Sequence, residues 1–549
     1  MQEWFSDFFS QLNKTKTYLV ITNVLLVFFL ILFNNLGVLP MRTGDFVFFT
    51  ILVLALALYR PGWAFMFFIG SIALENINLA PERLGIAMRP YQLIGGLLFI
   101  GVTIRFFSHK LYFKLVKLRY TDYSIFLIPL AGLLNIANST NPIAEIKFIL
   151  VLFSFSILYL LVRNYIQNTS DLKKSLPFFF SSALIIALYG FWQNLRFAKG
   201  LNSFSVMPGR PNSTLTEPDW LGLYLVLVVA GIYALVYYFA QKPDRERLVS
   251  ENVSISATYI FLTMIFALLI ISVSRSAWIG TLVMTVLFAF CIFTNLKFNF
   301  RDWQWKFTIK IKLGIIGAFL FGLGAVYIFH LTTFQLFNRA VSTGGAQKIT
   351  ISCDPNCDVQ TCPPAGGLVS TGIIIHDLSE LEQYGCRHIN LEEIETEKNR
   401  GQFVTEVNRD DPNVNVRAEV YRKSWSEIKA HPIIGIGWSN IPEVLGKDPR
   451  GANLNSSNIF LETYLGSGII GFLSLLIILV VIFLRALIAF FKETNLEQKT
   501  FALFILVSWT GIVIFNLFNA GIMLGFFWVW LGVANALKPA LEINGLSKS

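Results

Sequence analysis

Three arginines lie at the edges of apolar segments, and arginine is well suited to bind phosphate oxygens. Arg275 stands in SVSRSAWIG between two apolar runs, Arg210 in MPGRPNSTLTEPDW, and Arg417 at the start of an amphipathic stretch. The planar guanidinium group donates paired hydrogen bonds that match a phosphate or pyrophosphate group. We therefore predict that these arginines bind a pyrophosphate. The alternative is that each forms an ion pair with a carboxylate such as Glu217 or Asp219.

A second group of polar residues precedes a long apolar run. The stretch NSSNIFLETYLGSGIIGF begins at residue 455 and contains Ser457, Asn458 and Glu462. Ser456 or Ser457 is expected to cap the helix that follows, because a side-chain oxygen there accepts an otherwise unpaired backbone N–H. The other polar side chains could hold an acceptor hydroxyl, and Glu462 could take its proton.

The stretch NVRAEVYRKSWSEIKAHPIIGIGWSN, which begins at residue 415, predicts an amphipathic helix. Tyr421, Trp425 and Ile428 follow Arg417 at helical spacing, so one helix face carries all four side chains. Such a helix could lie on a membrane surface or contribute to a ligand site.

The end of this helix is marked by the pair His431 and Pro432. Proline stops a helix, and Gly435 and Gly437 then allow a tight turn. Imidazole is a frequent general base, so His431 is a second candidate for that role. The alternative is a purely structural histidine, since the helix dipole favours a histidine at a helix C-terminus.

The elements that must position these residues are membrane-spanning helices. Of the 549 residues, 54% are hydrophobic, and they form long blocks such as 18–36 and 276–296. A bilayer is crossed by about 20 apolar residues in a helix. We expect an all-α polytopic membrane protein with about 12–14 transmembrane helices. The candidate spans begin near Tyr18, Asp45, Pro61, Tyr91, Tyr123, Ile143, Leu176, Asp219, Val253, Ser276, Ile311, Ser457, Thr500 and Ala520. Gly466 and Gly468 are expected to separate a short helix, 457–465, from the span that begins at Ile469.

Four basic loops predict the orientation of these spans. The segments 105–119, 173–174, 242–247 and 297–312 are rich in Lys and Arg and fall on one side when the spans are counted. The positive-inside rule makes that side cytoplasmic, with both termini, in a multi-pass cytoplasmic (inner) membrane protein. The net charge of +10 then reflects topology and contact with membrane lipids, and no nucleic acid is expected as a partner.

One large loop is expected on the opposite, extracytoplasmic side. The segment 331–455 carries 12 basic and 16 acidic residues, so its net charge is −4 whereas the rest of the chain carries +14. A loop of this length is usually functional. We predict an N-terminal transmembrane bundle at 1–330, an extracytoplasmic loop domain at 331–456, and C-terminal transmembrane helices at 457–549. Within the loop, 366–375 could form a small strand pair, and the Glu-rich 391–398 a solvated helix.

The same loop contains four of the five cysteines, and the fifth lies within a span. An even number of cysteines in an outward loop predicts two disulfides, with three possible pairings. A metal site with His376 and His388 is the alternative, but the cysteine spacing lacks the familiar C-x2-C pair. The disulfide candidates are Cys353, Cys357, Cys362 and Cys386.

These segments together resemble the O-antigen ligase and polymerase superfamily. SRSAWIG resembles the family's SRGAW element, and R-x3-Y-x2-SW-x2-I-x2-HPIIGIG at 417–437 resembles R-x3-W-x2-AL-x2-I-x2-HPL-x-G-x-G. GRPNSTLTEPDWLGLYL resembles a looser element, R-x2-GTF-x2-PN-x-LA-x-YL, with Asp219 where asparagine is usual. NSSNIFLETYLGSGIIG resembles S-HN-x-FLE-x3-E-x-GI-x-G. The four motifs occur in family order across about 210–472, which makes the combination more specific than any one of them.

The resemblance implies a glycosyltransferase-type membrane enzyme. Its donor would be a glycan linked to polyprenyl pyrophosphate, handled on the outer face of the cytoplasmic membrane, and its acceptor a glycan, lipid or protein. No metal or other cofactor is implied. Arg210, Arg275 and Arg417 would stabilise the pyrophosphate leaving group, with Glu217, Asp219, Gly435 and Gly437 on the acceptor side or in supporting roles.

One position departs from the family pattern. The ligases carry a histidine before the asparagine of the HN pair, and Ser457 occupies that position here. A serine hydroxyl with an ordinary pKa can hydrogen-bond but cannot serve as the base. Three outcomes stay open: Glu462 or His431 is the base, the chemistry needs no strong base, or the protein is inactive.

Two other functions are also compatible with these features. A transporter or flippase for a lipid-linked glycan would use charged residues at mid-membrane and commonly shows internal repeats, and no convincing repeat is present. A sensor or scaffold would use the cysteine-containing loop to bind a partner, which leaves the membrane motifs unexplained.

Overall fold

The computed structural model describes residues 14–111, 113–207, 209–241, 249–295, 305–332, 336, 346–354, 374–375, 380–389, 394–410, 412–447 and 453–537. The chain forms two compact units. One consists of Met1–Thr333 with Ser426–Ser549, and the other of Phe334–Trp425. The segment predicted as an outward loop domain therefore contains one compact unit, and its final part belongs with the helices.

The larger unit is built from helices. Their bounds are α2 (Lys14–Asn35), α3 (Thr43–Tyr59), α4 (Pro61–Ser71), α5 (Pro90–Phe107), α6 (Tyr120–Gly132), α7 (Pro142–Tyr165), α8 (Thr169–Ala198), α9 (Pro218–Gln241), α10 (Val249–Ile271), α11 (Arg275–Asn295), α12 (Trp305–Ile328), α18 (Ile441–Leu445), α19 (Ile459–Lys492), α20 (Leu496–Asn516) and α21 (Gly525–Asn535). Short 3-10 turns lie at η1 (Glu82–Leu84), η2 (Leu133–Asn138) and η5 (Gly521–Met523).

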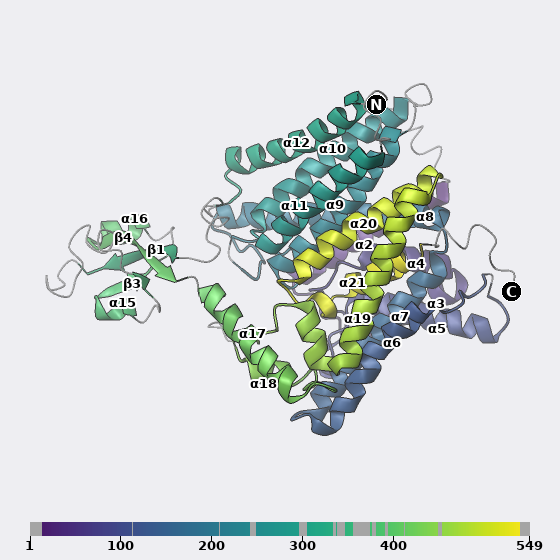
Figure 1. Ribbon diagram of the computed structural model, residues 1–549, viewed down its shortest axis with the longest axis horizontal. Coiled ribbons are helices and arrows are strands. Elements are labelled where there is room, and N and C mark those ends of the chain that lie inside the picture. Colours follow the sequence, from purple (N-terminus) through teal and green to yellow (C-terminus); the bar gives the residue numbers. More distant parts are fainter. Residues whose placement is uncertain are drawn as a thin grey trace. The chain divides into compact units, whose positions relative to one another are not determined.

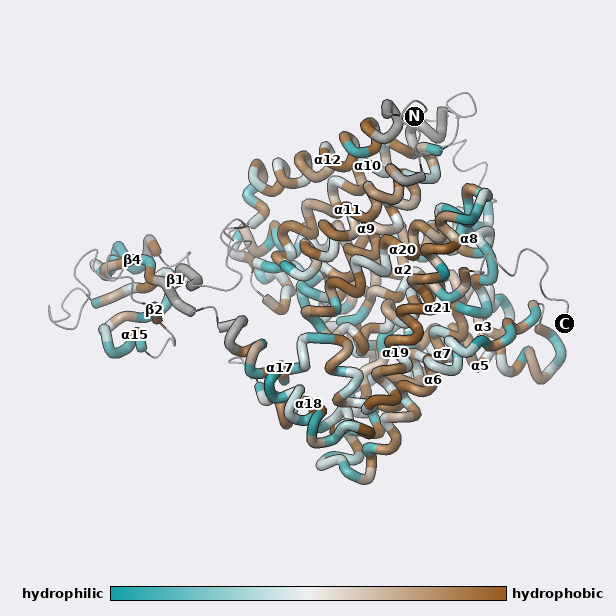
Figure 2. The backbone as a smooth tube through the Cα atoms, in the orientation of Figure 1, coloured by the Kyte–Doolittle hydropathy of each residue, from teal (hydrophilic) through white to brown (hydrophobic). Residues whose placement is uncertain are grey.

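A helix occupies each of the fourteen predicted spans. Within the described residues, ten helices are long and apolar enough to cross a membrane. The helices α3 and α21 are apolar but shorter, and α4 is also short. The protein is thus an all-α polytopic membrane protein, as predicted. Figure 2 shows hydrophobic residues along α9, α11 and α12 and hydrophilic residues mainly in the connecting loops.

Helix α9 lies at the centre of the bundle. Most of its residues are buried on every side, from Leu221 to Tyr237. It packs against α8, α10, α11 and α20, and Figure 1 shows α9, α11 and α20 running side by side. A helix that is apolar all round is expected in such a central position. Gly222 allows close packing at its start, because a Cβ there would lie 2.7 Å from the Cβ of Ala277 on α11.

A buried ion pair joins α6 and α7. Arg163 Nε lies 3.2 Å from Asp122 Oδ1, and the two side chains are only 4% and 1% exposed. The hydroxyl of Tyr159 and the amide of Asn535 on α21 also donate to Asp122. Three helices are therefore held together by one buried carboxylate, whose charge is compensated by arginine and by neutral donors.

The described part of the smaller unit contains a four-stranded sheet, of which the sequence suggested only a strand pair at 366–375, where β2 lies. Its strands are β1 (Ala346–Cys353), β2 (Ile374–Ile375), β3 (Cys386–His388) and β4 (Phe403–Asp410), in the order β2-β4-β1-β3. Strand β1 is antiparallel to β3 and β4, whereas β2 is parallel to β4. This unit also contains the helices α15 (Glu380–Gln383) and α16 (Ile394–Asn399) and the part of α17 (Pro412–Ala430) up to Trp425. Ile349, Ile351, Ile375, Leu381 and Val407 form its small core.

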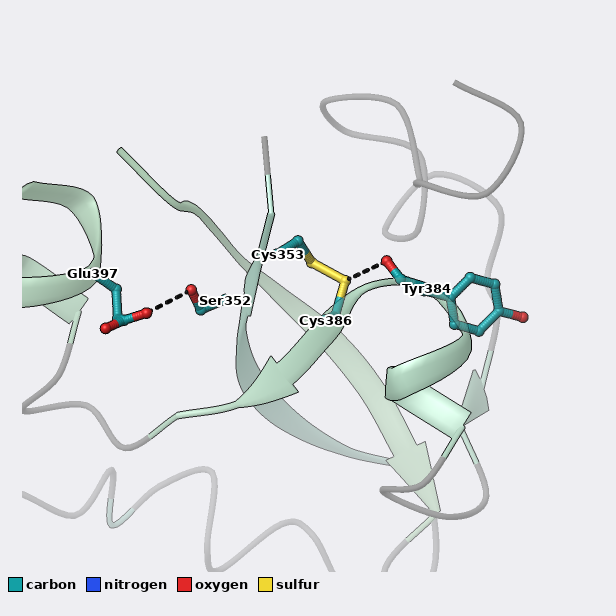
Figure 3. The surroundings of a disulfide bond; sticks show 5 residues. All are labelled: Ser352, Cys353, Tyr384, Cys386 and Glu397. Carbon is teal, nitrogen blue, oxygen red and sulfur yellow. Dashed lines mark hydrogen bonds between the residues drawn. A yellow bond between two sulfur atoms is a disulfide. The ribbon is translucent and has the colours of Figure 1, made fainter. Parts of the chain in front are cut away.

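One of the predicted disulfides is present at the edge of this sheet. Cys353 and Cys386 face each other in the β1–β3 register and are bonded (Figure 3). This bond removes both cysteines from the metal site considered as the alternative. Cys357 and Cys362 lie outside the described residues, as do His376 and 366–373 of the predicted strand pair.

The Glu-rich stretch is helical, as predicted, but it is not solvated throughout. Glu397 on α16 is buried. Ser352 Oγ donates a hydrogen bond to its carboxylate at 3.0 Å (Figure 3). Arg387 and Arg400 each approach Glu397 Oε1 to 2.9 Å. The hydrogen bond from Arg387 is the main reason why the pKa of Glu397 lies below its ordinary value.

Candidate functional site

Arg210 is clamped between the start of α9 and the turn that joins α10 to α11. Its Nε donates to Ser272 O at 3.0 Å, and its Nη2 lies 3.4 Å from both Val273 O and Asp219 Oδ1. Arg210 thus forms the ion pair that the sequence raised as the alternative to phosphate binding. Glu217, the other carboxylate considered, has an exposed side chain.

The turn that Arg210 contacts carries the first residues of the SRSAWIG motif. Val273 has a left-handed φ of 53°, which is uncommon for a β-branched residue, and the turn ends where α11 begins at Arg275. Trp278 Nε1 donates to Leu269 O at 2.9 Å, which ties α11 back to α10. Arg275 is half-buried at the N-terminus of its helix, where the helix dipole adds to the positive potential.

The loop after α20 links this motif to the start of α19. Asn519 Nδ2 donates to Ser276 Oγ at 2.8 Å. Two residues earlier in the chain, Leu517 O accepts a hydrogen bond from Asn458 Nδ2 at 3.1 Å. We call the residues joined in this way, Arg210, Asp219, Ser276, Asn458 and Asn519, the polar rim.

Asn458, not Ser456 or Ser457, caps α19. Its Oδ1 accepts the backbone N–H groups of Phe460 and Leu461 at 2.9 and 3.2 Å. The predicted serine cap is wrong because Ser457 has a left-handed φ of 50°, and because Ser456 Oγ instead donates to Asn458 O. Asn458 therefore both caps a helix and contacts the neighbouring loop.

Glu462 turns back toward the residues that precede the helix. Its Oε2 accepts the backbone N–H of Ser456 at 2.7 Å. The carboxylate thus orders the NSSN segment, and it brings Glu462, Ser456 and Asn458 together at one helix end. Glu462 lies one helical turn beyond the cap, and its backbone N–H donates to Asn458 O at 2.9 Å.

The predicted break in α19 lies at Gly468, whose φ of 61° and ψ of −163° are not helical. The turn after His431 packs into this break. Ile469 N donates to Ile433 O at 3.1 Å, and Ile436 N donates to Leu465 O at 2.8 Å. A Cβ at Gly468 would lie 2.2 Å from Ile433 O. The glycine is required for this close approach.

Gly435 and Gly437 allow the turn after His431 to pack closely against α19. Their φ values are 76° and 90°, and a Cβ at Gly435 would lie 2.4 Å from Leu465 O. His431 itself is exposed at the end of α17 (Pro412–Ala430), with its Nε2 3.9 Å from Glu427 Oε2 one helical turn earlier. The HP pair ends the helix, as the structural interpretation of the sequence predicted.

A residue that the sequence did not single out holds this turn in place. Glu145, on the first turn of α7, is fully buried and accepts the backbone N–H groups of Trp438 and Ser439 at 3.1 and 2.7 Å. Asn135 adds a hydrogen bond to Ile434 O at 2.8 Å. The only sequence signal for Glu145 is an acidic residue at the edge of an apolar span, where carboxylates are costly unless they are paired.

Arg417 lies on α17 in the smaller unit and is half-buried there. The predicted helix is present, but its buried stripe is Val420, Ser424 and Ile428. Of the four side chains predicted to share one helix face, Ile428 is buried and Trp425 is 55% exposed. An exposed tryptophan on an amphipathic helix is compatible with a helix at a membrane surface.

Residues 259–476 match the model of the O-antigen ligase family. The matched segment contains the α10–α11 turn, the smaller unit, the turn after His431, and the start of α19 with its break. Arg210, Asp219 and Asn519 lie outside it. No curated protein matches the chain.

Proposed function

The chain belongs to the O-antigen ligase and polymerase superfamily, and we propose that it transfers or polymerises an oligosaccharide linked to polyprenyl pyrophosphate. We place this reaction on the outer face of the cytoplasmic membrane, with both termini in the cytoplasm and the smaller unit outside. The donor would be a precursor of O-antigen or of a related surface polysaccharide, and the acceptor a glycan, lipid or protein.

The observation that carries the proposal is the hydrogen-bonded polar rim. Contacts from Arg210 to the α10–α11 turn, from Asn519 to Ser276, and from Asn458 to Leu517 join three of the motifs at one end of the bundle. The contacts span 62, 243 and 59 residues of the sequence. Their convergence is expected of a reaction site at the membrane surface and is not needed to build apolar helix packing.

In this proposal, positive charge stabilises the leaving group. The acceptor oxygen forms a bond to the anomeric carbon of the donor sugar, and the bond from that carbon to the pyrophosphate oxygen breaks. Arg275 is the main residue proposed to bind the departing pyrophosphate, because it is half-buried at the N-terminus of α11, where the helix dipole adds to its positive charge. The family resemblance predicts a pyrophosphate-binding role for Arg417 as well.

The acceptor hydroxyl is proposed to lie beside the start of α19. Ser457 can orient it by hydrogen bonding, as can Asn458. We propose that the hydroxyl proton goes to Glu462, whose Oε2 accepts the Ser456 N–H and whose other oxygen would receive the proton. His431 is the alternative acceptor for this proton, and a Glu462→Gln variant distinguishes the two.

The proposal is tested in cells in which Arg275→Ala replaces the natural protein. Loss of polymerised or ligated surface polysaccharide, with accumulation of its lipid-linked precursor, is the expected result. Arg83→Ala is the matched control, because Arg83 is an exposed arginine on the short η1 turn. Unchanged polysaccharide in Arg275→Ala cells would contradict the proposal. Movement of labelled lipid-linked glycan across proteoliposomes without glycan transfer would indicate a transporter instead.

A further inference from the structure

A small polar cavity lies beside the loop that carries Arg210. Its volume is about 140 Å³. It lies between the end of α2, the loop after α4, and the segment 204–214, and its polar lining includes Asn34, Asn35, Asn76, Ser213 and Thr214. None of the described residues that line it is charged. A cavity of this composition favours a neutral, hydroxyl-rich ligand over an ion.

The walls of the cavity are fixed by hydrogen bonds. The backbone N–H of Ser213 donates to Gln193 Oε1 at 2.7 Å, and Ser213 Oγ donates to Ile186 O on α8. Thr214 Oγ1 donates to Ala73 O at 2.7 Å, and Asn76 N donates to Thr214 O at 2.8 Å. The motif loop and the loop after α4 therefore form one rigid wall, which preorganises the cavity.

The amide groups inside the cavity have hydrogen-bonding capacity to spare. Asn35 Oδ1 accepts the Tyr189 hydroxyl at 2.8 Å, which leaves its NH₂ group as a donor. The side chains of the half-buried Asn34 and of Asn76, which is exposed at the cavity's edge, form no hydrogen bond within the described part of the chain. An amide presents a donor and an acceptor side by side, which matches two neighbouring hydroxyl groups of a sugar ring.

An aromatic stack stands beside these amides. The rings of Phe204 and Trp192 are stacked with centroids 5.8 Å apart and an interplanar angle of 13°, and Trp192 also stacks on Tyr189. Trp192 is 39% exposed and Phe204 37%. Arg196 lies 4.9 Å from the centroid of the Trp192 ring, which fixes the stack from one side. Flat, partly exposed aromatic faces suit the C–H face of a sugar.

Two residues that line the cavity have strained backbones. Phe204 has a φ of 55° and Ser213 a φ of 50°, both in the left-handed region that such side chains rarely adopt. Asn202 Oδ1 accepts the Phe204 N–H at 2.9 Å, and Phe204 O accepts from Gln193. Strain maintained by surrounding hydrogen bonds is concentrated at binding and catalytic sites.

We propose that this cavity binds one neutral sugar residue of the donor oligosaccharide. The amides of Asn34, Asn35 and Asn76 would bind its hydroxyl groups, and the Trp192–Phe204 stack would contact the next sugar of the chain. The inference rests on the proposed function, since Ser213 lies three residues after Arg210 in the same loop. The site would select the donor by its sugar, while Arg275 acts on the pyrophosphate.

Binding is tested on the full-length protein in nanodiscs by saturation-transfer NMR. The probes are the methyl glycosides of glucose, galactose, mannose, rhamnose and N-acetylglucosamine. At least one is expected to give saturation transfer, and the double variant Asn34→Ala/Asn76→Ala is expected to weaken its binding about fivefold or more through lost hydrogen bonds. Trp192→Ala should weaken the binding of a disaccharide more than that of the monosaccharide. Trp63→Ala is the control, because Trp63 is 36% exposed at the start of α4.

The outcome separates this inference from the proposed function. If no glycoside gives a signal, or if the signal is the same in the double variant, the sugar site is wrong. In that case Arg275→Ala would still abolish polysaccharide synthesis if the proposed function holds. If the site is correct, the double variant should raise the KM for the lipid-linked donor and change kcat much less. An unchanged unfolding temperature of the double variant is the check that it still folds.

Discussion

Asn519 donates a hydrogen bond to Ser276 Oγ at 2.8 Å, which fixes the loop after α20 against the first turn of α11. Ser276 follows Arg275, so this bond helps to set the direction of the arginine proposed to bind pyrophosphate. Asn519 Nδ2 also donates to Phe515 O at 3.3 Å, which orients the amide. Asn519 is thus a positioning residue, and it does not itself need to touch the substrate.

Asn519→Ala is expected to lower kcat for glycan transfer about tenfold, the effect of losing one hydrogen bond that orients a charged group. Steady-state rates on lipid-linked donor check this, with Asn141→Ala as control. Asn141 also accepts a hydrogen bond as the cap of α7, from Ala144 N at 3.0 Å, but it lies outside the polar rim. Equal rates in the Asn519 variant and the natural protein would exclude a positioning role.

Glu145→Ala is expected to release the turn after His431 from the bundle. Two buried backbone N–H groups, of Trp438 and Ser439, lose their acceptor, and each such loss costs about 1–3 kcal/mol. A lower unfolding temperature and reduced transfer activity are expected together. The control is Glu443→Ala, because Glu443 accepts the Thr140 hydroxyl at the surface of the same region. A stable, fully active Glu145 variant would show that the turn is held by its other contacts.

Arg163→Met tests the buried ion pair between α6 and α7. Removing one partner leaves the Asp122 carboxylate uncompensated in an apolar interior, which costs about 3–5 kcal/mol. Chemical unfolding in detergent should show this loss. Lys174→Met, which breaks an exposed pair with Asp171, should cost less than about 1 kcal/mol. If the two variants lowered the free energy of unfolding by similar amounts, the buried ion pair would contribute no more to stability than the exposed one.

The smaller unit is expected to lose stability in acid. The folded pKa of Glu397 lies below its ordinary value, so the ionised carboxylate contributes stability above the unfolded pKa of about 4.3. This contribution is lost as the pH falls through the lower, folded pKa. When the pH is lowered beyond about 4, the hydrogen-exchange protection of β1 and β4, corrected for intrinsic exchange, should therefore decrease. Glu397→Gln should weaken this dependence, and an identical pH profile in that variant would assign it to other groups.

Much of the helical architecture could be predicted from the sequence. Long apolar runs locate each helix, Pro432 ends α17, and Gly468 breaks α19, because these depend on local chemistry. Strands β1 and β4 were missed, although the apolar residues Ile349, Ile351 and Cys353 alternate with polar ones along β1 and belong to the small core. Their hydrophobic residues are few, and a surrounding segment rich in charge and glycine obscures the pattern.

In the candidate site, contacts between residues close in the sequence could be predicted, whereas contacts between distant residues could not. Asp219 was identified as a partner for Arg210, since the two lie only nine residues apart. The role of Asn519 depends on a contact with Ser276 across 243 residues, and that of Glu145 on a contact with Ser439 across 294 residues. A single polar residue at the end of an apolar run gives no indication of such a distant partner.

Glycan transfer by the reconstituted protein tests the central claim most directly. Proteoliposomes would contain the natural protein, Arg275→Ala or Arg83→Ala, and would receive a radiolabelled lipid-linked oligosaccharide with its acceptor. We predict that Arg275→Ala lowers kcat at least about a hundredfold, as expected when a group that stabilises the leaving group is lost, while Arg83→Ala retains the natural rate. Transfer at the natural rate by folded Arg275→Ala protein would contradict the proposal that Arg275 stabilises the pyrophosphate leaving group.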